Sequence, residues 1–256
     1  MSAEPQIITV GMIRVVPEKW NPDANMATLE CLVPEVAAAG ADIVITPEAF
    51  VDGYVIHEEG WTPERFAEVC EPGPDGPRAT RLREIAAEAG VWLVAGLSEQ
   101  RAEGFFNSAH LIAPDGRLVG TYDKLQVHPR YEHGRALRVF ETDFGPVGIC
   151  ICADRRWPEI IRTLRLKGAR IILMPTYGMS GPRNAVWIQT RSYENTCWVC
   201  FTHPRESLIT DPNGEIAAQV ISGGEFLVYA CDLTRADDAP MLEDRHPEVY
   251  GFAWEQ

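Results

Sequence analysis

Residues 147–176 read VGICICADRRWPEIIRTLRLKGARIILMPT, and this stretch decides the fold class. An apolar run ends at Cys152, a segment with helical spacing begins at Pro158, and a second apolar run occupies 169–176. Proline is favoured in the first turn of a helix, and short, almost wholly apolar strands are typical of a sheet covered by helices. The stretch therefore predicts a strand, a helix and a second strand of an α/β fold.

Strands and helices alternate along most of the chain, so helices are expected to pack on sheet faces. Two hairpins, over 107–124 and 206–221, have Pro-Asp-Gly and Pro-Asn-Gly at their turns, and each follows a helix–strand unit. This repetition indicates an internal duplication of one α/β half. Other strands are expected at 6–16, 42–48, 91–100, 198–203 and 226–233, with two more within 137–152 around a turn at Gly145-Pro146, and helices at 21–40, 78–90, 157–168 and 183–197.

The chain shows no low-complexity stretch and no convincing linker, so a single domain over 1–256 is expected. Glycine and proline interrupt 53–77, which predicts an irregular segment, and 234–256 is a mostly polar C-terminal tail. Pro34 lies inside the first helical pattern and is expected to kink or interrupt that helix.

The charge balance limits the possible partners. Of 256 residues, 23 are Lys or Arg and 37 are Asp or Glu, which gives a net charge of −14. Nucleic acid and anionic membranes need a basic face, so neither is expected as a partner. Residues 1–16 lack the features of a signal peptide, and no apolar run is long enough to span a bilayer. Seven cysteines in mostly apolar surroundings indicate reduced thiols and a cytoplasmic protein.

Three reactive side chains stand where apolar strands end: Glu48, Lys124 and Cys152. Strand ends are where sites form in layered α/β folds. Together, a carboxylate could take the thiol proton, the thiolate could attack a carbonyl-like carbon, and the ammonium could stabilise the oxyanion. Taken singly, each residue has an ordinary alternative: a helix cap, a solvated lysine and a small core residue.

Four motifs link these three residues. They are PEAFVDGY (47–54), YDKLQVHPRYE (122–132), CADRRWPE (152–159) and RSYENTCWVCFTH (191–203). In this order they resemble the motifs of the nitrilase superfamily, the carbon–nitrogen hydrolases that act on amides, nitriles and carbamoyl groups. The resemblance covers nearly the whole chain.

The resemblance implies a four-layer α-β-β-α sandwich, usually paired into dimers across a helical face. It implies a catalytic triad of Glu48, Lys124 and Cys152, with Glu132 as a second acid that helps to position the substrate and the triad. The backbone amide of Ala153 would join Lys124 in the oxyanion hole. A small amide or carbamoyl substrate and a second copy of the chain, in a homodimer or a higher oligomer, are the expected partners, and no cofactor is expected.

The cysteines allow a second interpretation. Cys150-x-Cys152 and Cys197-x-x-Cys200 together could form a zinc or redox site. However, the second pair lies where a helix gives way to a strand, whereas a thioredoxin-like motif opens a helix. No metal is therefore expected. Cys152 is the expected nucleophile because it stands two residues before Asp154, as in the family motif, and Cys150 is expected to be buried in the strand.

Arg155 and Arg156 suggest a substrate carboxylate, since guanidinium groups bind carboxylates in a bidentate way. The run DRRWPE resembles N-carbamoyl-D-amino-acid amidohydrolases, which use arginine there for the substrate carboxylate. The chain departs from that subfamily at Gln126, where those enzymes have His, at TYG (176–178), and in the shorter segment 125–147. The alternative is that the arginines pair with nearby acids or with a dimer partner.

Aromatic residues close to the motifs are candidates for shaping the pocket. Tyr54 and Tyr177 are expected to bind substrate, whereas Trp157 is expected to pack its helix onto the sheet. The histidines show no metal spacing. His128 and His133 flank Glu132 and could line the pocket, but surface or core roles are favoured for both.

The expected function is cytoplasmic, cofactor-free hydrolysis of a non-peptide C–N bond through a Cys152 thioester, with release of ammonia or an amine. Asp154 resembles the amidase and carbamoylase branches more than the true nitrilases. The alternatives are a nitrilase acting on a small nitrile and a catalytically silent member of the fold used for protein binding.

Overall fold

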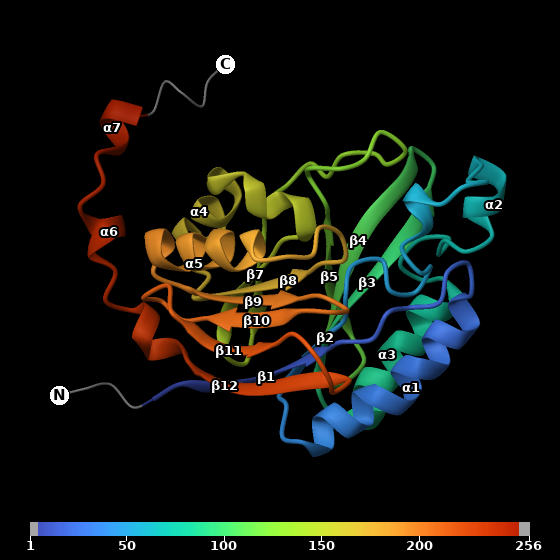
Figure 1. Cartoon of the computed structure of the whole chain (residues 1–256), viewed down its shortest axis with the longest axis horizontal. Helices are drawn as coiled ribbons and strands as arrows, with labels where there is room; N and C mark the ends of the chain where they lie inside the picture. Colours follow the sequence, from blue (N-terminus) through green and yellow to red (C-terminus); the bar gives the residue numbers. More distant parts are fainter. Residues whose placement is uncertain (1–4, 251–256) are drawn as a thin grey trace.

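The computed structural model describes residues 5–250 and consists of two six-stranded sheets packed face to face, with helices on both outer sides (Figure 1). Helices α1 (Pro22–Ala38) and α3 (Pro77–Ala89) cover the first sheet, and α4 (Pro158–Leu166) and α5 (Arg183–Asn195) cover the second. The expected α-β-β-α sandwich is confirmed.

The first sheet has the strand order β12-β1-β2-β3-β4-β5, and the second has the order β11-β10-β9-β8-β7-β6. The strands of the first sheet are β1 (Ile7–Ile13), β2 (Ile43–Ile45), β3 (Trp92–Arg101), β4 (Gly104–Ile112), β5 (Leu118–Asp123) and β12 (Phe226–Asp232). Those of the second are β6 (Val139–Thr142), β7 (Gly145–Ile149), β8 (Ile171–Pro175), β9 (Trp198–Thr202), β10 (Ser207–Thr210) and β11 (Ile216–Val220).

The two sheets share one topology, as the predicted duplication requires. In each sheet an antiparallel edge strand pairs with the first of three parallel strands, and an antiparallel hairpin follows the third. The parallel strands β1, β2 and β3 therefore correspond to β7, β8 and β9. Each half is one β-α-β-α-β unit with a hairpin added.

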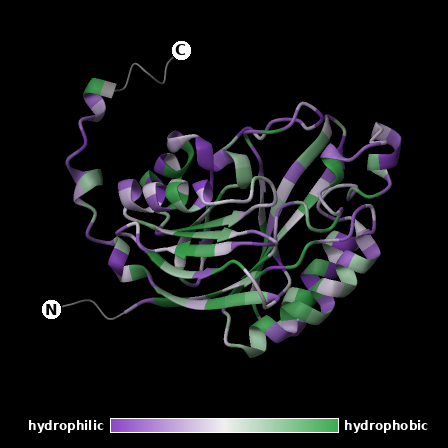
Figure 2. Ribbon diagram, viewed as in Figure 1, coloured by the Kyte–Doolittle hydropathy of each residue, from purple (hydrophilic) through white to green (hydrophobic). Residues whose placement is uncertain are grey.

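The core lies between the two sheets and under the helices. Apolar residues gather on the strands and on the inward faces of the helices, whereas polar residues gather on the outer surface (Figure 2). The largest buried cluster joins both sheets and includes Ile45 of β2, Ile149 of β7 and Trp198 of β9. Burial of the apolar strand faces is the main force that holds the sheets together.

Short elements complete the chain. They are the 3₁₀ helices η1 (Val55–His57), η2 (Cys152–Arg156) and η3 (Leu233–Ala236), and the short helices α2 (Pro63–Ala67), α6 (Pro240–Glu243) and α7 (Pro247–Tyr250). Segment 53–77 contains only η1 and α2, in agreement with the irregular segment expected there. Within residues 5–250, no helix is both long and apolar enough to cross a membrane. The expectations of an N-terminus without a signal peptide and of a polar C-terminal tail fall partly on residues 1–4 and 251–256. These residues lie outside the described part of the chain.

Two local predictions are wrong. Helix α1 runs without interruption through Pro34, because the neighbouring Leu32, Val33 and Val36 are buried and hold the last turn against the sheet. The turn between β6 and β7 lies at 143–144, and Gly145 and Pro146 already belong to β7. Proline is tolerated near the start of a strand, where a missing N–H costs little.

Candidate active site

A cavity of about 370 Å³ opens where loops of the two sheets meet, and Glu48, Lys124 and Cys152 all line it. Glu48 lies three residues after β2, Lys124 directly follows β5, and Cys152 begins η2 after β7. The fold thus brings together the three residues that the sequence singled out, from three distant segments.

Glu48 is fully buried, and both of its carboxylate oxygens have partners. Oε1 accepts hydrogen bonds from the Lys124 ammonium and, at 2.8 Å, from Asn107 Nδ2. Oε2 accepts one from the backbone N–H of Tyr177 at 3.1 Å, and the N–H of Glu48 donates to the carbonyl of Thr176 at 3.4 Å. These bonds hold the carboxylate in one orientation and tie it to the second half of the molecule.

Lys124 is buried beside Glu48. Burial alone would lower the pKa of Lys124, but the negative charge of Glu48, with smaller contributions from Cys152 and Asp154, raises that pKa above its usual value. The side chain is therefore a charged ammonium at neutral pH. An ammonium held in a cavity can stabilise negative charge on a substrate oxygen.

Cys152 has a left-handed backbone conformation, with φ at 46°. Burial raises the pKa of its thiol, and the Glu48 carboxylate, to which the thiol is hydrogen-bonded, raises it further. Lys124 and Arg155 act in the opposite direction. The resting group is therefore a thiol with a carboxylate in reach as its base.

Asp154 fixes the turn that carries the thiol. Its Oδ2 accepts hydrogen bonds from the N–H of Ile151 at 2.9 Å and from the Tyr122 hydroxyl at 2.7 Å. Its Oδ1 accepts one from the N–H of Gln126 at 2.9 Å. Since Gln126 lies two residues after Lys124, a single buried carboxylate joins the Cys152 turn to the lysine segment.

The two adjacent arginines occupy different environments. Both line the cavity, but Arg155 is fully buried, with Nη1 3.4 Å from Cys152 Sγ. Arg156 is exposed at the rim, where its guanidinium contacts the sulfur of Met179. Only Arg156 is therefore free to meet a substrate group that reaches the cavity mouth.

An aromatic pair forms one wall. Tyr54 lines the cavity, and the ring of Tyr177 stacks against it with the centroids 4.2 Å apart. Lys19 lies over both rings, 4.6 Å from the Tyr177 centroid, and its ammonium donates to the Tyr54 carbonyl at 2.9 Å. Tyr54 is thus the ring that faces the cavity, and Tyr177 lies behind it and supports it. The backbone N–H of Tyr177 donates a hydrogen bond to Glu48.

The structure does not bring Glu132 into the cavity. Its side chain is exposed, while its N–H donates to the Phe105 carbonyl at 2.7 Å. The preceding residue, Tyr131, takes the inward position, lines the cavity and hydrogen-bonds through its hydroxyl to Ser98 Oγ at 2.7 Å. The turn at 128–131 therefore presents Tyr131, not the acid, to the site.

Trp157 is also not where the sequence analysis expected it. It is 39% exposed and lines the cavity, because its extended backbone, with φ at −97°, follows the end of η2 and precedes α4. Packing onto the sheet is instead provided by Ile160, Ile161 and Leu164 of α4, which are buried. Ala153 lines the cavity next to Cys152.

Several lining residues were not singled out by the sequence. Asn107, buried on β4, is one of them, and the only signal for it was an amide within an apolar strand. His57 is another, and its ring meets that of His128 edge to face with the centroids 4.8 Å apart. Gln126 and His128, which the sequence analysis did consider, also line the cavity. His133 is exposed and hydrogen-bonds to the Leu125 carbonyl at 2.7 Å.

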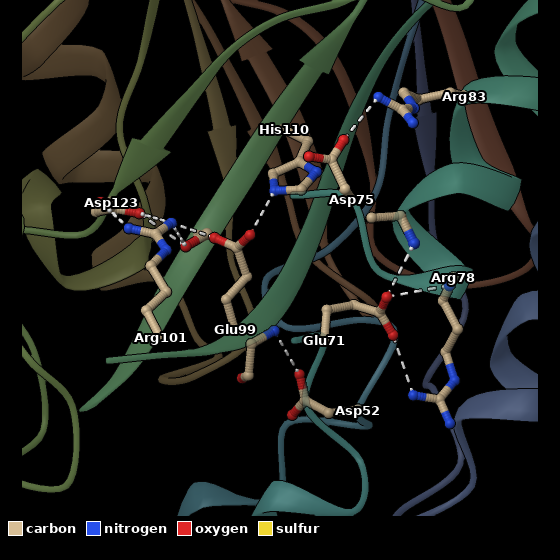
Figure 3. A network of polar contacts seen from close by, with 12 residues as sticks. Asp52, Glu71, Asp75, Arg78, Arg83, Glu99, Arg101, His110 and Asp123 are labelled. Atoms are coloured by element: carbon tan, nitrogen blue, oxygen red, sulfur yellow. Dashed lines mark hydrogen bonds and ion pairs between the residues drawn. The ribbon is translucent and has the colours of Figure 1, made fainter. Parts of the chain in front are cut away.

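A partly buried ionic network anchors β5, the strand that precedes Lys124 (Figure 3). Arg101 makes a bidentate contact with Asp123, at 2.7 and 2.8 Å, and pairs with Glu99, which also contacts His110 at 3.1 Å. Burial would raise the pKa of Glu99, but His110 and Arg101 hold it at about 2. Because Asp123 directly precedes Lys124, this network fixes the backbone that presents the ammonium.

Of the cysteines other than Cys152, Cys31 is exposed and the others are buried. Cys150, Cys197, Cys200 and Cys231 are fully buried and unoxidised. Among residues 5–250, no group of three or more His, Cys, Asp or Glu side chains has an arrangement that could hold a metal ion.

Comparison with known proteins identifies the family. Residues 9–241 match the family Carbon-nitrogen hydrolase. The nitrilase of Pyrococcus abyssi is 35% identical over 267 residues, which cover 95% of this chain and 99% of the relative. An N-carbamoylputrescine amidase of Arabidopsis thaliana is 31% identical over 169 residues, which cover 62% of this chain and 56% of the relative. The crystal structure of a carbon-nitrogen hydrolase from Helicobacter pylori G27 has a TM-score of 0.88 at 19% identity, over 99% of this chain and all of that one.

The chain belongs to the carbon–nitrogen hydrolase family. The resemblance to the nitrilase superfamily that its motifs indicated is confirmed, and so is the expected enzyme class, a hydrolase of C–N bonds.

Proposed function

We propose that this enzyme hydrolyses a small carboxylated amide or N-carbamoyl compound, with Cys152 as nucleophile, Glu48 as general base and Lys124 as oxyanion stabiliser. The observation that carries the proposal is the convergence of a thiol, a buried carboxylate and a charged ammonium on one cavity, with Glu48 in contact with both of the others.

The reaction follows from these contacts. Glu48 takes the proton of the Cys152 thiol as Sγ attacks the substrate carbonyl carbon, and the oxygen becomes an anion stabilised by Lys124 and the N–H of Ala153. The C–N bond then breaks, the nitrogen takes the proton from Glu48 and leaves as ammonia or an amine, and a thioester remains. Glu48 next takes a proton from water, whose oxygen attacks the thioester, and the proton returns to Sγ as the acid leaves.

The charges around the cavity favour an anionic substrate. Among the lining residues of the described chain, Glu48 supplies the one carboxylate and is already paired with Lys124, whereas Arg156 stands at the rim. An amine such as the free end of N-carbamoylputrescine would find no acid to pair with. A carboxylate would find a guanidinium, and the Tyr54 face supported by Tyr177 would pack against the chain between the two substrate ends.

Release of ammonia from matched substrates tests the proposal. N-carbamoyl amino acids and ω-amides of dicarboxylic acids are expected to be turned over faster than N-carbamoylputrescine and uncharged amides. Arg156→Met is expected to raise KM for the carboxylated substrates about tenfold to a hundredfold, since a charge-assisted hydrogen bond contributes about 1.5–3 kcal/mol. Preference for the amine substrate, or an unchanged KM in the variant, would contradict the proposed substrate class.

Nitriles belong in the same panel because one relative is a nitrilase. Faster ammonia release from a small nitrile than from every amide would make nitrile hydrolysis the function. If purified protein with an accessible Cys152 thiol released no ammonia from any member of the panel, the silent-scaffold alternative would be favoured.

We further propose a cytoplasmic homodimer or higher oligomer. The seven free cysteines suit a reducing compartment. The outer helices expose apolar side chains, among them Leu166 of α4 and Val186 and Tyr193 of α5. Light scattering on the purified protein would measure the mass, and Val186→Glu is expected to shift it toward that of a monomer.

A further inference from the structure

Arg155 is held directly against the nucleophile. Its side chain is fully buried, and Nη1 lies 3.4 Å from Cys152 Sγ. Nη2 donates to Asn184 Oδ1 at 2.9 Å and to the Gly178 carbonyl at 3.4 Å. Arg155 is the third residue after Cys152, which is one turn of the 3₁₀ helix η2, so the two side chains lie on the same side of that helix.

The positive charge of Arg155 has no carboxylate partner among the described residues. Its hydrogen-bond acceptors are an amide oxygen, a carbonyl and the sulfur, and its Nε has no partner. The guanidinium lies near the rings of Trp187 and Phe201, 5.3 and 5.6 Å from their centroids. A buried, unpaired charge is unfavourable, so its field acts strongly on the nearest group that can become negative. That group is the thiol of Cys152.

A hydrogen-bond chain fixes the orientation of the guanidinium. Asn184, at the start of α5, donates through Nδ2 to Glu206 Oε1 at 2.5 Å and to the Met179 carbonyl. Glu206 Oε1 also accepts from the N–H of Gly181 at 2.8 Å. With Nδ2 engaged in this way, Oδ1 of Asn184 must face Arg155. The carboxylate of Glu206 therefore fixes the orientation of the Asn184 amide, and this amide fixes the orientation of the Arg155 guanidinium.

We propose that Arg155 is a catalytic residue that stabilises negative charge on Cys152 Sγ, and that Asn184 and Glu206 are the positioning residues that aim it. The proposal rests on the proposed role of Cys152 as nucleophile and deepens it. Lys124 is already hydrogen-bonded to Glu48, so Arg155 is the cation that faces the sulfur without a competing carboxylate.

The charge appears on sulfur twice in a turnover. It develops when the thiol proton passes to Glu48 before Sγ bonds to the substrate carbon, and again when the thioester C–S bond breaks and the pair of electrons returns to sulfur. Arg155 favours both events. The two neighbouring arginines thus have different proposed roles: Arg155 stabilises negative charge on the nucleophile, and Arg156 binds the substrate carboxylate.

Alkylation of Cys152 by iodoacetamide tests the proposal without any substrate. The rate is followed from pH 5 to 10 by mass-spectrometric fragment mapping of the peptide that holds Cys150 and Cys152, with Cys152→Ala as the background. Arg155→Met is expected to move the midpoint of the pH profile upward by about one unit and to slow alkylation at pH 7 about tenfold. Arg155→Lys is expected to move it less, because the charge is kept.

The positioning residues supply a second measurement in which Arg155 itself is unchanged. Asn184→Ala is expected to move the midpoint in the same direction by a smaller amount, because the guanidinium is free to turn from the sulfur. Glu206→Gln, which keeps an acceptor for Asn184, is expected to move it less than Asn184→Ala. Arg183→Met, which removes an exposed arginine next to Asn184, is the control for net charge and is expected to leave the profile unchanged.

A wild-type profile in Arg155→Met, or an equal shift in Arg183→Met, would overturn the proposal. If Arg155→Met does not fold, as judged by circular dichroism, the Asn184→Ala profile decides: a shift supports the role of Arg155, and no shift contradicts it. Failure of the proposed function gives a different result from failure of this inference. If Cys152 is not the nucleophile, Cys152→Ala keeps full turnover. If only the role of Arg155 is wrong, Cys152→Ala is inactive, and the alkylation profile of Arg155→Met equals that of the wild type.

Discussion

The two halves of the molecule share a scaffold but differ in what their loops supply. Strands β1 and β7 are each followed by an eight-residue loop, 14–21 in one half and 150–157 in the other, and each loop leads to a helix that begins with proline. By the register that makes Gly11 of β1 equivalent to Gly148 of β7, Val15 corresponds to Cys152. Val15 is half-buried and packs against the apolar cluster of the first half, whereas Cys152 is 5% exposed and lines the cavity.

A second pair of equivalent positions meets at the site. When the two halves are aligned by the register of their parallel strands, Glu48, which follows β2, is equivalent to Thr176, which follows β8. The N–H of Glu48 donates to the carbonyl of Thr176, so the two counterparts are in contact. The first half therefore supplies the acid and the cation, and the second supplies the thiol and the guanidinium. The comparison shows that the duplicated scaffold fixes where side chains meet, and that the loops decide which side chains these are.

The largest expected effect comes from removing the one reactive group that the second half supplies. Cys152→Ala is expected to lower kcat by at least about a thousandfold, since loss of a nucleophile removes the covalent route. Ammonia release measures it. Cys150→Ala, two residues earlier and buried in the core, is the matched control and is expected to retain measurable turnover. An active Cys152→Ala with an inactive Cys150→Ala would reverse the assignment of the nucleophile.

The corresponding change in the first half is Glu48→Gln. Loss of the general base is expected to lower kcat about 10²- to 10⁴-fold. The Lys124 ammonium would also lose its buried counter-charge, so the melting temperature is expected to fall. Steady-state kinetics and a thermal melt check both effects. Turnover within about threefold of wild type would show that another group takes the thiol proton.

Asp52 is a buried acid of the first half whose ionisation affects stability. Asp52 hydrogen-bonds through Oδ1 to the N–H of Ser98 at 3.0 Å, while its Oδ2 has no partner, and burial raises the pKa of Asp52 from 3.8 to about 6 (Figure 3). A raised pKa in the folded state means that ionisation opposes folding. The contribution of Asp52 to stability therefore falls as the pH rises from about 4 to about 6, and it stays at this lower level above that range.

Asp52→Asn cannot ionise and is expected to be more stable than the wild type above pH 6, by at most about 3 kcal/mol, with no advantage below pH 4. Urea unfolding at pH 4 and pH 8 measures the difference, and exposed Asp238→Asn is the matched control. A gain of equal size at both pH values would show that the charge of Asp52 is not the cause.

The smallest expected effect is the loss of stability when either of two equivalent glycines, one in each half, is replaced by alanine. Gly11 of β1 and Gly148 of β7 each occupy the middle of a three-residue parallel ladder. A Cβ would lie 2.1 Å from Val36 Cγ1 at the first position and 2.6 Å from Ile172 Cδ1 at the second. Each Gly→Ala change is expected to lower the free energy of unfolding by about 1–3 kcal/mol. The loss is expected to be larger at Gly11, because a valine methyl is stiffer than the end of an isoleucine. Urea midpoints give the order, and the reverse order would show that the second half packs more rigidly.

The fold was readable from the sequence because its apolar strands and its helix boundaries are strong local signals. The strand–helix–strand unit at 147–176 and the two hairpins appear as predicted. Pro34 and the turn at 143–144 were misjudged because local rules do not include the burial of Val33 and Val36 or the tolerance of β7 for proline at its start.

The site was partly readable. The motifs located Glu48, Lys124 and Cys152, because each is a reactive residue at the end of an apolar strand. The environments of Arg155 and Arg156 were not readable, since successive residues of a 3₁₀ helix point about 120° apart and the sequence does not say which direction faces the core. The same limit applies to Tyr131 and Glu132, of which only the tyrosine faces the cavity.

The left-handed backbone at Cys152 has a consequence for how this chain would change over generations. Such a conformation disfavours every residue with a Cβ by about 1–2 kcal/mol relative to glycine. The turn would therefore be most stable with glycine, whereas the proposed role as nucleophile requires cysteine. In a lineage that no longer needs the enzyme, this position is expected to drift to glycine early, so that loss of activity would come with a gain in the stability of the turn.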